Sequence, residues 1–81
     1  MYQNIAEPIE VLAVFNKKQI KPLSFKWRQR VYKIARVTQQ WSSPAGKYKL
    51  YHFGIVDTSD NFFEICYSEE DFGWSILQTW T

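Results

Sequence analysis

The sequence predicts an all-β protein: a single small antiparallel meander of about six strands, curved into a roll or a small barrel. Apolar and polar residues alternate with a period of two. Clusters of turn residues recur about every ten residues, and no segment has a helical period with convincing caps. The 81 residues suit one domain, and six twisted strands curl readily. We therefore expect one β domain over residues 1–81, with residues 1–7 as a loose N-terminal segment.

The first strand is expected at about residues 9–15 and the second at about residues 19–27, because apolar side chains alternate in both. Pro22 has no N–H to give to a strand ladder, which predicts that the second strand lies at an edge or starts late. A tight turn at residues 28–29 then leads into the third strand.

The third strand changes phase after its start. Ile34, Val37 and Trp41 are spaced three and four residues apart. A β-bulge would produce this spacing, and so would one helical turn within residues 35–41. The β-branched residues in this segment favour the bulge. The Ser-Ser-Pro-Ala-Gly stretch at residues 42–46 is the clearest predicted loop.

Three further strands are expected at about residues 47–56, 62–67 and 73–79. The turn at residues 57–61 is rich in Asp, Asn and hydroxyl residues, and the turn at residues 68–71 is acidic. The alternating apolar positions predict a core formed by Val11, Phe25, Trp27, Tyr32, Ile34, Trp41, Phe53, Ile55, Phe63, Ile65 and Trp74.

The charge is unevenly distributed along the chain. Residues 1–50 hold all ten Lys and Arg and only two acids, a net charge of +8, whereas residues 51–81 hold six acids and no Lys or Arg, a net charge of −6. Such asymmetry suggests a basic surface that meets a polyanion. The alternative is that the two charged halves face each other across strands or between subunits.

The sequence offers no set of residues that predicts catalysis or metal binding. His52 is the only histidine and is expected to point outward from its strand, and Cys66 is the only cysteine. A zinc site needs about three or four ligands, and a nucleophilic triad needs a Ser or Cys and an acid converging on the histidine. We therefore expect a protein that is not an enzyme and that needs no cofactor. No apolar run reaches the roughly 20 residues of a membrane span, so we expect a cytoplasmic protein without a membrane partner.

The segment Phe-Lys-Trp-Arg-Gln-Arg-Val-Tyr-Lys at residues 25–33 is the strongest local feature. Its lysines and arginines are expected to gather near the hairpin tip and to form a surface for nucleic acid or for an acidic protein. Arginine is suited to binding phosphates, and exposed aromatic side chains can stack on nucleobases. The alternative is that the aromatic side chains belong to the core and the basic side chains keep a sheet edge soluble. The candidate binding residues are Lys17, Lys18, Lys26, Arg28, Arg30 and Lys33.

The same segment carries a family resemblance. The Pro-Ile-Glu-Val start at residues 8–11, the Phe-x-Trp-Arg-Gln-Arg-x-Tyr stretch at residues 25–32, Trp41 and the terminal Trp-Ser-Ile resemble a family of small uncharacterised bacterial domains. Gln29 stands where that family usually has Gly, in a turn that suits a positive φ. Some of its members are linked to Y-family translesion DNA polymerases, so the resemblance implies a role in DNA damage tolerance and assigns no reaction.

Two non-catalytic functions therefore stay open. The first is a binding module whose basic surface meets nucleic acid or an acidic protein. The second is a homo-oligomerising scaffold, in which the basic half of one chain meets the acidic half of another and forms a homodimer.

Overall fold

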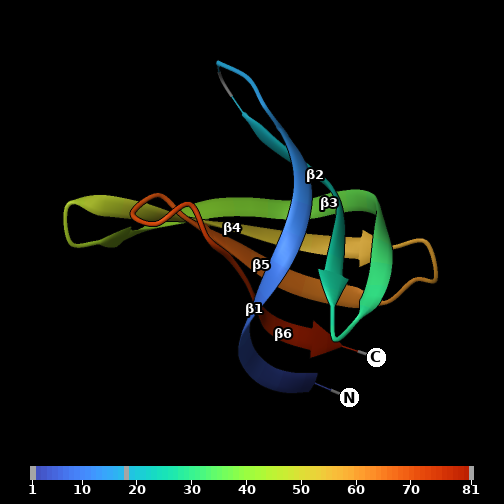
Figure 1. Ribbon diagram of the computed structural model, residues 1–81. Helices are drawn as coiled ribbons and strands as arrows, with labels where there is room; N and C mark the ends of the chain where they lie inside the picture. The colour runs from blue at the N-terminus through green and yellow to red at the C-terminus, as the bar shows by residue number, and fades with distance from the viewer. Residues whose placement is uncertain (1, 18, 81) are drawn as a thin grey trace.

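The computed structural model describes residues 2–17 and 19–80, which form a closed six-stranded barrel (Figure 1). The strands follow one another around the barrel in chain order, every neighbouring pair is antiparallel, and the last strand closes the barrel against the first. The predicted all-β barrel is confirmed. Among the described residues there is no helix of the length and apolarity that a membrane crossing requires. The strands are β1 (Tyr2–Phe15), β2 (Ile20–Trp27), β3 (Arg30–Ala45), β4 (Tyr48–Asp57), β5 (Phe62–Ser68) and β6 (Trp74–Trp80).

Two long strands divide the barrel into two sheets. Residues 2–9 of β1 pair with β6, whereas residues 10–15 pair with β2. Residues 30–33 of β3 pair with β2, and residues 34–45 pair with β4. The small sheet therefore consists of the end of β1, β2 and the start of β3. The large sheet consists of the rest of β1 and of β3 together with β4, β5 and β6. The β1–β2 hairpin and the β3–β4 hairpin project from the barrel in different directions (Figure 1), and Tyr2 at the start of β1 pairs with Trp80 at the end of β6.

Bulges produce the bends in these two strands. The register of β3 against β4 shifts between Ile34 and Arg36 and again between Val37 and Gln39, so the bulged strand predicted for residues 35–41 is confirmed. In β1 the register against β6 shifts between Asn4 and Glu7, where Ala6 has a φ of +73°. An extra residue bends a strand and increases its twist, which allows one strand to serve both sheets.

The first strand and the third strand are longer than the sequence pattern predicts. Residues 2–7, expected as a loose segment, form the first half of β1. Residues 42–45, expected as a loop, belong to β3, and the turn consists of Gly46 and Lys47. The prediction of a loop at residues 42–46 was therefore wrong. Proline fits an edge strand because no ladder partner needs its N–H, and the far edge of β3 is unpaired at Pro44.

The core fills the barrel with aromatic and aliphatic side chains. Six of the predicted core residues are buried, and Val11, Trp27, Tyr32 and Ile34 pack against them while partly exposed. The prediction of a buried Trp41 was wrong, because this side chain is 41% exposed. The second bulge of β3, between Val37 and Gln39, moves Trp41 off the face that Val37 occupies, so Trp41 lies opposite His52 on the outside. The fully buried side chains are Phe25, Phe53, Phe63, Ile55, Ile65, Ile76 and Pro22.

Candidate functional site

The outer surface of the small sheet, which we call the three-strand face, carries lysines and aliphatic side chains side by side. Lys26 in β2 lies opposite both Glu10 in β1 and Val31 in β3, and Lys33 lies opposite Ser24. Because Ser24 and Lys26 are two residues apart in one strand, their side chains share a face. The two lysines are therefore diagonal neighbours, and both are exposed.

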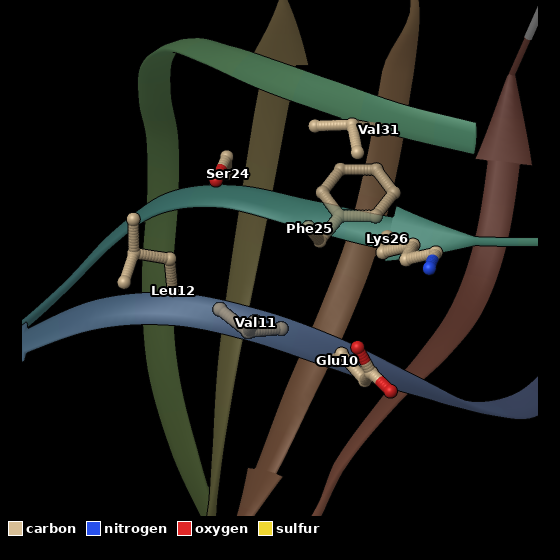
Figure 2. Close-up of a pocket in the computed structure, with 7 residues that line it drawn as sticks. All are labelled: Glu10, Val11, Leu12, Ser24, Phe25, Lys26 and Val31. Atoms are coloured by element: carbon tan, nitrogen blue, oxygen red, sulfur yellow. The ribbon is translucent and has the colours of Figure 1, made fainter. Parts of the chain in front are cut away.

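A groove of about 270 Å³ crosses this face (Figure 2). The labelled side chains of Glu10 and Lys26 lie near one another at one end, and Leu12 lies toward the other (Figure 2). Leu12 is 65% exposed and Val31 63% exposed. These are aliphatic side chains on a surface that faces water, so the groove offers both cationic and apolar contacts.

Arg28 and Arg30 lie at the β2–β3 turn. The side chain of Arg28 donates to both oxygens of the Glu7 carboxylate, with Nη2–Oε2 at 2.7 Å and Nε–Oε1 at 3.3 Å. Trp27 donates its indole N–H to the same carboxylate at 2.9 Å, and the guanidinium of Arg28 lies 4.5 Å from the centroid of that indole. These hydrogen bonds, chiefly the one from Arg28, lower the pKa of Glu7 below its ordinary value. The cation of Arg28 is therefore committed to an internal ion pair, although its side chain remains 64% exposed.

The structure brings together only part of the predicted basic cluster. Lys26 and Lys33 share the three-strand face, and Arg30 lies beside the turn with its guanidinium 5.4 Å from the ring centroid of Tyr32. Lys17 precedes the start of β2, whereas Arg28 follows its end, so these two lie at opposite ends of the strand. Lys18 lies outside the described residues.

Most of the basic side chains have no internal counter-charge. In residues 2–17 and 19–80, Arg28 is the only Lys or Arg that has a carboxylate within 4.0 Å. Even Lys26 and Glu10, which are cross-strand neighbours, form no such pair. In the described part of the chain, therefore, no Lys or Arg of the basic half forms an ion pair with an acid of the acidic half.

A second cluster lies on the outside of the large sheet, around His52 in β4. The hydroxyl of Ser43 lies 2.9 Å from Nε2 of this histidine, and Oε2 of Glu64 lies 3.3 Å from Nδ1. The indole of Trp41 is stacked on the imidazole, with the ring centroids 5.2 Å apart and the planes 3° apart. We call these four residues the His52 cluster. The imidazole is well covered, since its side chain is only 12% exposed.

Sequence reasoning placed His52 on an outer strand face but missed Ser43 and Glu64. Both are diagonal neighbours of the histidine, one on each adjacent strand: His52 pairs with Trp41 in β3 and with Cys66 in β5. Only the strand register reveals such neighbours, and the register depends on the position of the Gly46 turn. No group of three His, Cys, Asp or Glu side chains in the part of the chain that the structure describes is placed to hold a metal ion.

A search among curated proteins gave no match to this chain, and a search among solved structures gave none either. One family model matches, that of a domain of unknown function, DUF6504, and it covers residues 1–80. The match extends over every described strand, including the β2–β3 turn and the His52 cluster. The chain therefore belongs to the DUF6504 family.

Proposed function

We propose that this protein is a non-catalytic module that binds nucleic acid through the phosphates, using the three-strand face. The observation that carries the proposal is the group of exposed lysines on this face, which lack a carboxylate partner in the described part of the chain. Phosphate contacts by Lys and Arg release counterions and supply most of the sequence-independent affinity for nucleic acids. The resemblance to small domains linked to translesion DNA polymerases supports DNA as the partner and DNA damage tolerance as its setting.

The length of the basic surface sets the size of the expected footprint. Lys21 and Lys26, both exposed, are five residues apart along β2, which is roughly 17 Å at strand spacing. Lys21, Lys26 and Lys33 then provide about three phosphate contacts, whereas Arg30 alternates to the other face of β3, beside Tyr32. The affinity should fall with salt with a log–log slope of roughly −2 on single strands and −3 on duplex DNA.

Fluorescence anisotropy with labelled single-stranded and duplex oligonucleotides at low salt tests this proposal. The double variant Lys26→Gln/Lys33→Gln should weaken binding to all sequences alike, because phosphate contacts carry no base information. Lys47→Gln/Lys49→Gln on the β3–β4 hairpin removes the same charge from a different place and serves as the matched control. Equal weakening by the two variants, or wild-type binding no tighter than about millimolar, would overturn the proposal.

The exposed aliphatic side chains favour a second candidate, an acidic protein partner. Val31 lies opposite Lys26, Leu12 lies opposite Ser24, and both are more exposed than valine and leucine usually are. Such a partner would cover them, whereas phosphates would not. Leu12→Ser/Val31→Thr should therefore leave oligonucleotide affinity unchanged if the lysines bind phosphates. The same double variant should abolish binding of an acidic protein partner, or formation of a homodimer, if either of these uses the face. Sedimentation of the wild type at about 100 µM, where even weak specific contacts begin to form, tests the homodimer.

The non-catalytic part of the proposal needs its own test because of the His52 cluster. Ser43, His52 and Glu64 are connected in the order used by nucleophilic hydrolases. We propose that the His52 cluster holds the imidazole of His52 and the indole of Trp41 in place and does not activate Ser43 as a nucleophile. A fluorophosphonate probe, which labels activated serines, should therefore not label Ser43. Labelling of wild type that disappears in His52→Gln would show that the protein is an acyl-transfer enzyme.

A further inference from the structure

The indole of Trp41 is an exposed flat surface supported from behind. The imidazole of His52 lies parallel to it in an offset stack, with the ring centroids 5.2 Å apart, and covers part of one face. The residue remains 41% exposed, and its other face is turned away from the histidine. An exposed tryptophan on an outer sheet surface would ordinarily move among several rotamers, but here the stacking contact favours one position.

The histidine that supports this indole is itself held at both ring nitrogens. Ser43 from β3 contacts Nε2, and Glu64 from β5 contacts Nδ1. Glu64 is as well covered as the histidine, with 13% of its side chain exposed. Three neighbouring strands thus fix the plane of the imidazole, and the imidazole fixes the plane of the indole. A surface aligned before binding loses less conformational freedom when a ligand stacks on it.

We infer that the outer face of Trp41 is a stacking site for a nucleobase. An indole face stacks on any base, and one such contact is worth about 1–3 kcal/mol. Glu64 contacts Nδ1 of the histidine that supports the indole, and its negative charge disfavours a phosphate at this position and favours the uncharged base. The occupant is a base of a single strand, since the bases of a duplex are stacked on one another. The choice of nucleic acid rests on the proposed function.

The β-strand β3 connects the two proposed sites. Lys33 on the three-strand face and Trp41 lie eight residues apart in β3, roughly 27 Å at strand spacing and less where the strand bulges. A single strand of several nucleotides covers such a distance. A ligand bound at both sites would place phosphates at the lysines and one base on Trp41.

Binding of base-containing and abasic oligomers separates stacking from phosphate contacts. Trp41→Leu keeps an apolar side chain but removes the π-face, and it should lower the affinity for a short oligothymidylate by roughly 5- to 150-fold. Its affinity for an abasic oligomer of the same length should equal that of wild type. Trp41→Phe should recover part of the loss. Trp80→Leu, at another exposed tryptophan, is the matched control and should have no effect. Equal loss on both oligomers, or none in Trp41→Leu, would overturn the inference.

Adenosine distinguishes this inference from the proposed function because it carries a base and no phosphate. In a ¹⁵N-labelled sample, adenosine at millimolar concentration should shift the indole N–H signal of Trp41, which is assigned by its absence in Trp41→Leu. A shift with adenosine but no oligonucleotide binding would refute phosphate binding by the three-strand face and would still support the stacking site. Oligonucleotide binding that depends on Lys26 and Lys33, without any adenosine shift, would refute the stacking site alone.

Discussion

Gln29→Gly is expected to stabilise this protein, although Gln29 touches neither candidate site. The two-residue turn between β2 and β3 places Arg28 at a φ of +52° and Gln29 at a φ of +66°. Hairpin turns of this kind need positive φ at both central residues. A residue with a Cβ carries a penalty of about 1–2 kcal/mol in the left-handed region, and glycine does not.

The expected size of the effect follows from two opposing contributions. Glycine removes that penalty, but its freer unfolded chain costs about 0.5–1 kcal/mol on folding. The net stabilisation should be about 0.5–1 kcal/mol. For a domain of 60–100 residues this corresponds to a rise in Tm of about 2–8 °C.

Gly46 provides the matched control, because it occupies the β3–β4 turn at a φ of +64°. A Cβ added there would meet no atom within 4 Å, so Gly46→Ala reports backbone strain without a steric clash. By the same two contributions it should destabilise the protein by about 0.5–1 kcal/mol. Thermal unfolding followed by circular dichroism measures both variants. A lower Tm for Gln29→Gly, or an unchanged Tm for Gly46→Ala, would show that the turn geometry described above is wrong.

Three other predictions concern the core, the cysteine and the ion pair at the β2–β3 turn. Ile65 is fully buried, so Ile65→Val should lower the free energy of unfolding by about 0.5–1.5 kcal/mol in urea titrations, and no change would contradict this packing. Burial, and to a smaller degree the charge of Glu64, raises the pKa of the Cys66 thiol; a disulfide reagent should therefore react slowly with the native protein and rapidly in urea, and fast native labelling would count against burial. The lowered pKa of Glu7 stabilises the folded state above its ordinary value of 4.5, and this stabilisation is lost as the pH falls through the lower folded-state pKa. Urea unfolding should therefore show Glu7→Gln less stable than wild type at pH 7, with the difference shrinking below about pH 4.5; a difference independent of pH would refute the ion-pair contribution.

The fold class could be predicted because strand alternation is a local property. Phe53 and Ile55 in β4, and Phe63 and Ile65 in β5, are two residues apart and all buried, as their spacing predicts. Local composition misled where an element bends or extends. Ser-Ser-Pro-Ala-Gly resembles a loop, but of these residues only Gly46 lies in the turn. Serine and proline are tolerated in the strand because the other edge of β3 is unpaired there.

The candidate sites were less predictable because they depend on register. The sequence indicated the basic residues, but it did not show that Arg28 pairs with Glu7, 21 positions earlier in the chain. A single bulge after Ile34 would place Ile34, Val37 and Trp41 on one face, because Val37 and Trp41 are four residues apart, and this spacing assigned Trp41 to the core. A second register shift, between Val37 and Gln39, moves the following side chains to the opposite face. The outward position of Trp41 therefore depends on the second bulge of β3.

The bend in β3 also determines how the two candidate sites are oriented relative to one another. Lys33, before the bulges, lies on the three-strand face, and Trp41, after them, faces outward from the large sheet. At the bend, Thr38 donates a hydrogen bond to the carbonyl of Gly54 at 3.1 Å, and the absence of a Cβ at Gly54 allows both Thr38 and the ring of Phe62 to approach β4 closely. These contacts lie at the bend of β3, between the proposed lysine site and Trp41. They add to the backbone pairing of β3 with β4, which continues on both sides of the two register shifts. The relative orientation of the two proposed sites is therefore set by the bulged strand pair as a whole.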